Sequence, residues 1–125
     1  MKFINLTQHK LTEDQIKDLV SAGFDEDSIQ VYPDPFVKQT LTFEKLPAMP
    51  DIRKAAVTLA QYAKAQAATN VMIGGAPYLM RPLEEELAYN GITHHYAYTE
   101  RKTVEKVNED GTVEKTSVFV FAGWI

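Results

Sequence analysis

Residues 72–87 read MIGGAPYLMRPLEEEL, and this stretch decides the class of fold. The apolar run Asn70–Ile73 shows no alternation, which is typical of a strand buried on both faces. It ends on a pair of glycines, and a helical, leucine-spaced segment then runs to the Asn90-Gly91 pair, which favours a helix end. With prolines at 77 and 82, this helix either starts near Pro77 and kinks or starts at Pro82 after a short turn.

A second strand–helix unit lies at the start of the chain. Residues 3–7 (FINLT) form an apolar run long enough for one buried strand. Thr12 and Gln15 then form a T-x-x-Q capping box at the start of a helix, with Leu11 packed against Ile16 as a staple. The stripe Ile16, Leu19 and Val20 predicts the buried face, and Gly23 predicts the helix end.

The middle of the chain holds a further strand and a long helix. Residues 28–32 (SIQVY) predict a strand that ends in a loop at Pro33-Asp34-Pro35. Residues 36–50 are compatible with a short strand, an ordered crossover or a lid. A helix is expected from Pro50-Asp51 to about Ala68. Its apolar face is predicted to comprise Ile52, Ala55, Ala56, Leu59, Ala60 and Ala63.

Beyond residue 91 the sequence predicts strands only. Residues 92–98 (ITHHYAY) indicate a fourth strand, and residues 103–124 a hairpin that turns at Gly111. Strands alternating with helices favour a mostly parallel sheet with helices on both faces. We therefore expect one α/β domain over residues 1–125, a three-layer Rossmann-like sandwich with an antiparallel C-terminal hairpin.

Composition limits the classes of function. The 125 residues are 45% hydrophobic and 24% charged, and 17 acids against 13 bases give a net charge of −4, which argues against binding of duplex nucleic acid. No apolar run approaches the length of a membrane span, so no membrane partner is expected. The absence of cysteine suits the reducing cytoplasm. With three histidines and no cysteine, neither a metal site nor a cofactor is expected.

The candidate site follows from the topology. Ligands of open α/β sheets bind beyond the carboxyl ends of strands, where the strand order reverses. If the first strand is central, that place lies between the ends of the first and third strands. The groups predicted to meet there are Thr7, Gln8 and His9 on one side and Gly74, Gly75, Ala76 and Tyr78 on the other.

The chemistry of these groups favours an anion. Glycines at 74 and 75 let a ligand approach backbone amides, and the following helix start adds unpaired N–H groups. Arg81 supplies a positive charge nearby. The alternative is that the glycines serve only the turn between strand and helix. Neither G-x-G-x-x-G nor a P-loop pattern is present.

Other polar residues have simpler interpretations. His94 and His95 are adjacent on a strand, so they face opposite sides and do not share a metal. Residues 84–86, three glutamates, are interpreted as a solvated helix face. Arg101 and Lys102 are expected at the end of the fourth strand, where one of them reaches a phosphate or both protect a hairpin edge.

The stretch INLTQHKLTEDQ (4–15) resembles the opening of small CRISPR-associated proteins of the ring-nuclease type, which are CARF-like. There a strand ends in a polar pair with His, here Gln8-His9, and L-T-x-x-Q opens the first helix. The resemblance implies metal-independent cleavage of cyclic oligoadenylate, in which the ribose 2′-OH attacks the neighbouring phosphate. His9 would act as general acid or base, and the amides of Gly75 and Ala76 with Arg81 or Lys102 would stabilise the phosphate charge.

A symmetric cyclic ligand also implies a homodimer. Two alternatives stay open beside cleavage of such a nucleotide. The same pocket would serve a binding module without turnover. The hairpin, with aromatic residues at 96, 98, 119, 121 and 124, would serve an interaction protein.

Overall fold

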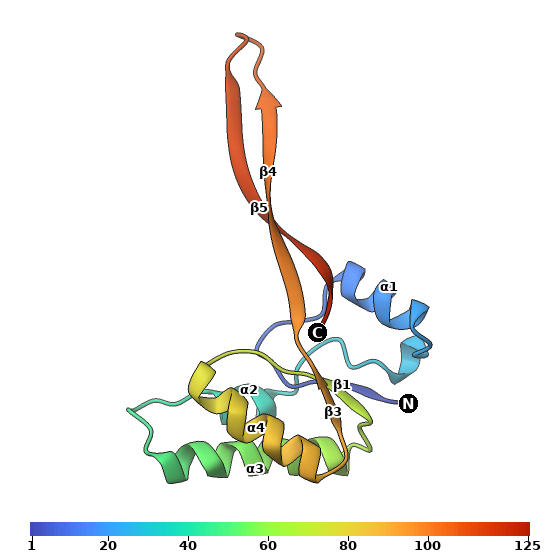
Figure 1. Cartoon of the computed structure of the whole chain (residues 1–125), viewed down its shortest axis with the longest axis vertical. Coiled ribbons are helices and arrows are strands. Elements are labelled where there is room, and N and C mark those ends of the chain that lie inside the picture. The colour runs from blue at the N-terminus through green and yellow to red at the C-terminus, as the bar shows by residue number, and fades with distance from the viewer.

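A computed structural model describes all 125 residues. Three short strands, β1 (Phe3–Asn5), β2 (Asn70–Met72) and β3 (Thr93–His95), form a parallel sheet in the order β1-β2-β3. The register pairs Ile4 with Val71 and Val71 with His94. A separate antiparallel hairpin of two long strands rises from this body (Figure 1). The protein is thus mixed α/β, as predicted.

The strand expected at residues 28–32 shrinks to a single bridge. Ile29 pairs in parallel with Phe3 on the side of β1 that β2 leaves free, after the 3-10 turn η1 (Glu26–Ser28). The chain then leaves the sheet because the Val31 carbonyl accepts from the Leu11 N–H and from the Asn5 side chain. β1 therefore has the Ile29 bridge on one side and β2 on the other, and it is the first strand of the β1-β2-β3 sheet.

The first helix, α1 (Glu13–Ser21), begins as predicted. The Thr12 hydroxyl accepts from the Gln15 N–H at 3.2 Å, and the Gln15 Oε1 accepts from the Thr12 N–H at 2.9 Å. Leu19 is buried, whereas Val20 is 44% exposed and does not belong to the buried face.

The region around residues 33–50 contains a helix that the sequence interpretation missed. α2 (Pro35–Leu41) begins where a loop was predicted, because Asp34 caps it by accepting from the Phe36 N–H at 2.8 Å and Pro35 takes the first turn. Val37 of α2 is fully buried. The short-strand alternative for residues 36–50 is therefore wrong.

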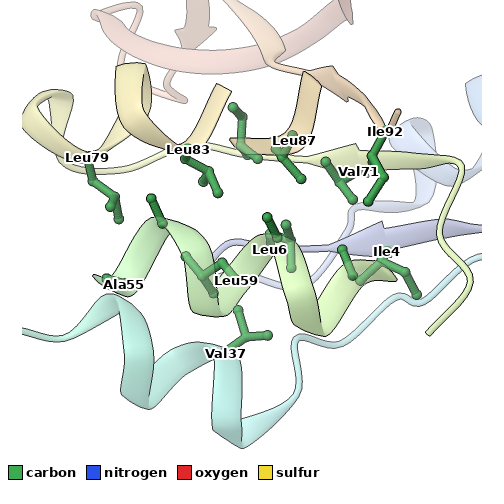
Figure 2. Close-up of a cluster of buried hydrophobic side chains, with 14 of the residues drawn as sticks. Ile4, Leu6, Val37, Ala55, Leu59, Val71, Leu79, Leu83, Leu87 and Ile92 are labelled. Atoms are coloured by element: carbon green, nitrogen blue, oxygen red, sulfur yellow. The ribbon is translucent and has the colours of Figure 1, made fainter. Parts of the chain in front are cut away.

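Two longer helices complete this layer. α3 (Met49–Ala65) ends three residues before the expected Ala68, and all six residues of its predicted apolar face are buried. α4 (Pro77–Tyr89) starts at Pro77, so Pro82 lies inside the helix and not at its start. Figure 2 shows Leu79, Leu83 and Leu87 of α4 facing α3, whose Leu59 lies between them and Val37 of α2. This cluster also contains the side chains from one face of the sheet: Ile4, Leu6, Val71 and Ile73.

The opposite face of the sheet carries a smaller core. Phe3 and Met72 point to this side and pack with Leu11 and Leu19 of the α1 region and with Phe24. Figure 1 accordingly shows α1 away from the α2–α4 layer. Alternate residues of β1 and β2 thus serve the two cores, which explains the uninterrupted apolar runs at these strands.

The hairpin is longer than predicted. β4 (Ala97–Val107) pairs with β5 (Val113–Trp124), and Gly111 adopts a φ of 85° in the turn. The strand expected at residues 92–98 is divided, since β3 ends at His95 and the chain continues from Ala97 into the hairpin. Trp124 joins the hairpin to the body through Phe3, with ring centroids 5.4 Å apart. No helix is long and apolar enough to cross a membrane.

Candidate functional site

A cavity of about 470 Å³ opens at the carboxyl ends of β1 and β2. Its walls include six predicted site residues, Thr7, Gln8 and His9 after β1 and Gly74, Gly75 and Ala76 after β2. The structure therefore brings the two predicted turns together at one place. The other lining residues are Lys10, Thr12, Gln15, Leu41, Met72, Ile73, Leu79, Tyr96 and Ala97.

The turn after β1 is held by one buried amide. Asn5 has no exposed surface, and its Nδ2 donates to the carbonyl oxygens of His9 at 2.7 Å and Val31 at 3.0 Å. Its Oδ1 accepts from the Thr7 N–H at 2.9 Å and from the Thr7 hydroxyl at 2.7 Å. The Thr7 hydroxyl also accepts from the His9 N–H at 3.2 Å. Thr7 thus lines the cavity, but its hydroxyl is hydrogen-bonded within the turn. It therefore stabilises the turn and is not a free donor to the cavity.

This arrangement leaves two backbone donors free. The N–H groups of Gln8 and Lys10 have no acceptor within the chain, although both residues line the cavity. Lys10 also brings a charge to this wall, and its ammonium lies 6.0 Å from the centroid of the Tyr32 ring. Lys10 was not among the predicted residues, because its position beyond His9 gives no motif of its own.

The turn after β2 supplies further donors. The N–H groups of Gly74, Gly75 and Ala76 find no acceptor within the chain. Ala76 is the N-cap of α4 and provides no side-chain cap, so the positive end of this 13-residue helix is uncompensated at the cavity. Gly75 has a φ of +134°, and a Cβ placed there would meet no atom within 4 Å. The glycine therefore both permits the turn and leaves its backbone open to a ligand.

A buried amide completes the set of donors. Gln15 is only 8% exposed, and its Oε1 is used by the capping bond to Thr12. Its Nε2 makes no hydrogen bond with the chain, and the residue lines the cavity. The sequence analysis assigned Gln15 only to the capping box. Gln15 lies on the side of α1 that faces the turns, and this position is the signal for its second role.

Tyr96 of the cavity wall belongs to a small cluster of titratable side chains. His94 Nε2 lies 2.9 Å from Glu84 Oε1, so Glu84 is not the freely solvated side chain that was predicted. Tyr96, which lines the cavity, contacts the His94 ring at right angles. Burial raises the pKa of Tyr96, and the nearby Glu84 carboxylate raises it further. Tyr96 therefore keeps its hydroxyl proton and remains a donor. His95 faces the opposite side, as predicted, and stacks on Phe3.

Three predicted site residues lie elsewhere. Arg81 pairs with Glu85 at 3.3 Å with 88% of its side chain exposed, and it lines a different hollow between α3 and α4. Tyr78 lines that same hollow. Lys102 lies in β4, opposite Val118 of β5, and does not line the cavity. β4 belongs to the hairpin that projects from the body (Figure 1). No three His, Asp or Glu side chains come together in a group that could hold a metal ion.

The fold and this cavity define a mixed α/β domain with a donor-rich pocket at the ends of adjacent parallel strands. Over residues 1–125 the chain matches the family model described as the uncharacterized protein MJ1673 family, and it therefore belongs to that family. No curated protein and no solved structure matches it. The family description names no activity and no link to CRISPR-associated proteins, so the resemblance in residues 4–15 stays a prediction.

Proposed function

We propose that the cavity binds a nucleotide-type anion through a phosphate group. One observation carries the proposal: five residues whose backbone N–H groups have no acceptor within the chain, at 8, 10 and 74–76, line one cavity. Oriented amides at a helix start bind phosphate readily. The proposal includes a Rossmann-like arrangement, in which β1 is central and its carboxyl end marks the switch in strand order.

The charge of the walls supports the same ligand class. The chain carries a net charge of −4, yet no Asp or Glu lines this cavity, whereas Lys10 and His9 do. An apolar part, formed by Leu41, Leu79 and Tyr96, suits a nucleobase beside the phosphate. A volume of about 470 Å³ lies within the usual range for small-molecule sites. These features favour a nucleotide over inorganic phosphate.

The sharper form of the proposal is cleavage of a cyclic oligoadenylate. In this reaction the ribose 2′-oxygen loses its proton to a base and attacks phosphorus, and the bond from phosphorus to the 5′-oxygen breaks. The 5′-oxygen takes up a proton, so the products are a 2′,3′-cyclic phosphate and a 5′-hydroxyl. In this proposal His9 exchanges the proton, and the 74–76 amides stabilise the phosphate. Lys10 takes the part that was predicted for Arg81 or Lys102. Binding without turnover is the alternative within the same pocket.

A thermal-shift series tests binding, with phosphate, mononucleotides and linear and cyclic oligoadenylates as probes. A ligand at a hundred times its dissociation constant should stabilise the fold by about 2.7 kcal/mol. Lys10→Ala should reduce the shift, whereas Arg81→Ala and Lys102→Ala should leave it unchanged. Absence of a shift with every nucleotide contradicts the proposal. Chromatography of the bound nucleotide then separates cleavage from binding, since only cleavage gives linear products that His9→Ala abolishes.

A further inference from the structure

The hairpin leaves one long edge of β4 unpaired. The Asn108 N–H donates to the Thr112 carbonyl at 2.8 Å, so along β4 the residues at 106, 104, 102 and 100 direct their backbone groups to β5. The odd-numbered residues from 99 to 107 direct theirs outward. An exposed edge of this length is a template for pairing with another strand. A lone two-stranded hairpin is also only marginally stable in water.

We propose that two copies of this chain pair through their β4 edges, antiparallel, about a two-fold axis at Thr103. In this register Thr103 lies opposite Thr103 of the partner subunit, and the outward-facing residues of both strands meet as hydrogen-bonded pairs. The result is a four-stranded sheet in the order β5-β4-β4-β5. The occupant of the edge is thus a second copy of the chain, as expected for an isologous contact.

The charges along β4 are complementary to themselves in this register. Glu100 falls opposite Lys106 of the partner subunit, and Arg101 falls opposite Glu105 of the partner subunit. By symmetry each pair occurs twice, which gives four opposite-charge pairs and no like-charge pair. Within one chain, Glu100, Arg101 and Lys106 form no salt bridge. The dimer therefore supplies partners for charges that the single chain leaves unpaired.

Neighbouring registers lack this complementarity. Moving the axis to residue 102 puts two Lys102 side chains opposite each other, and moving it to 104 puts Lys102 opposite Lys106. An axis at residue 101 puts two Arg101 side chains opposite each other, and an axis at residue 105 puts two Glu105 side chains opposite each other. Like charges directly opposite destabilise a sheet. Pairing through the outer edge of β5 gives no better charge complementarity. An axis at Ser117 puts Lys115 opposite Phe119 of the partner subunit, and an axis at Lys115 puts two lysines opposite each other.

The existing cross-strand contact extends the pattern. Lys115 Nζ lies 3.6 Å from Glu105 Oε1 within one hairpin. In the dimer Glu105 would lie between Lys115 and Arg101 of the partner subunit, and Lys106 between Glu114 and Glu100 of the partner subunit. Rows of alternating charge would thus cross three of the four strands, since Arg101 faces Phe119 and Glu100 faces Val120 within their own hairpin. This inference rests on the hairpin alone and is independent of the ligand proposed for the cavity.

Single cysteines test the register, because the chain has none of its own. In an antiparallel hydrogen-bonded pair the Cα atoms are about 5.5 Å apart, so Thr103→Cys should oxidise to a disulfide-linked dimer. Lys102→Cys is the matched control, since its two copies would be diagonal neighbours about 7–8 Å apart. A dimer linked at 103 and not at 102 supports the axis. Linkage at 102 alone, or at neither position, overturns it.

Charge reversal tests the interface without a crosslink. Light scattering over a micromolar concentration range should show a dimer that Arg101→Glu weakens by about tenfold or more. The double variant Arg101→Glu/Glu105→Arg should restore the dimer in part, because Glu105→Arg also puts a like charge opposite Lys115 in the same hairpin. Lys102→Glu, opposite Val104 of the partner subunit, should have little effect. Far-UV circular dichroism checks that each variant folds. A monomeric wild type, or a dimer indifferent to Arg101→Glu, contradicts the proposal.

Discussion

The Asn5 Nδ2 atom lies 2.7 Å from the carbonyl oxygen of His9, and this contact fixes the turn that forms one wall of the cavity. Asn5 is fully buried, and both its donors and its acceptor oxygen are used within the protein. Its neighbour Thr7 links the same amide to the His9 N–H. The side chains of Asn5 and Thr7 make the hydrogen bonds that hold this turn. The backbone N–H groups of Gln8 and Lys10 are therefore not used within the chain.

Replacing Asn5 should cost stability and binding together. Asn5→Ala removes four hydrogen bonds, each worth about 1 kcal/mol, and leaves the buried Thr7 N–H without an acceptor, which adds about 1–3 kcal/mol. The carbonyls of Val31 and His9 keep the Leu11 N–H and the Thr7 hydroxyl as donors. We expect a loss of about 3 kcal/mol or more in urea unfolding. Asn108→Ala, which removes one bond at the exposed hairpin tip, should change stability by less than about 0.5 kcal/mol. Equal losses for the two variants would contradict the role of Asn5.

The two glycines of the second turn should respond differently. Gly75 has a φ of +134°, so Gly75→Ala should destabilise the fold by about 1–3 kcal/mol. At Gly74 an added Cβ would lie 3.9 Å from the Thr7 Cγ2, an ordinary contact, so Gly74→Ala should leave the melting temperature nearly unchanged. Its methyl group should nevertheless weaken nucleotide binding. A Gly74→Ala protein that binds as tightly as wild type would show that no ligand approaches this backbone closely.

Trp124 should contribute more to stability than Phe119, which lies further along the hairpin, because Trp124 attaches the hairpin to the body. Trp124 lies within 5.4 Å of Phe3 and 5.2 Å of Phe121, measured between ring centroids, whereas Phe119 is 74% exposed. Trp124→Ala should therefore lower the free energy of unfolding by about 3 kcal/mol. Phe119→Ala should change it by less than about 0.5 kcal/mol. Trp124→Phe should cost less than Trp124→Ala, because it keeps the ring and removes a buried indole N–H that has no partner.

Stability should fall on mild acidification because of His95. Burial lowers the pKa of His95, and the neighbouring His94 lowers it further. The Nε2 of His95 lies 2.9 Å from the Asn70 Nδ2, a contact that suits the neutral ring. The folded state thus binds this proton less readily than the unfolded state. The stability contribution is present above about pH 6.5 and declines as the pH falls below it.

This dependence is measured by urea unfolding between neutral pH and pH 5. His95→Gln, whose amide oxygen still accepts from Asn70, should flatten the decline. His9→Gln, at an exposed position, should leave it in place. A decline unchanged in His95→Gln would assign the effect to another group.

Sequence alone predicted the parts of the fold that depend on local chemistry. The capping box of Thr12 and Gln15 and the alanine face of α3 are visible in the pattern because neighbouring residues create them. The meeting of two turns at one place was predicted because β1 and β2 both end in turn-forming residues. Six predicted site residues therefore line one cavity.

The errors came from features that local patterns do not distinguish. Asp34-Pro35 is equally suited to a loop and to a helix start, and only the burial of Val37 against α3 decides for α2. Arg81 was misplaced because the sequence left two alternatives for the start of α4. In the helix that begins at Pro77, Leu79, Leu83 and Leu87 are buried, so residue 81 faces away from the core. Lys102 was misplaced because β4 continues through an irregularity at Tyr98/Thr99 instead of ending there.

The most direct test of nucleotide binding in the cavity uses Gln15. Gln15→Glu keeps an oxygen that accepts from the Thr12 N–H, so the capping box survives, but it replaces the free Nε2 donor by negative charge. Gln61→Glu, on the exposed side of α3, changes the net charge by the same amount and is the matched control. Isothermal titration calorimetry with the nucleotide that gives the largest thermal shift should show binding to wild type and Gln61→Glu and at least about tenfold weaker binding to Gln15→Glu. Equal affinity in all three proteins would contradict a phosphate site in this cavity.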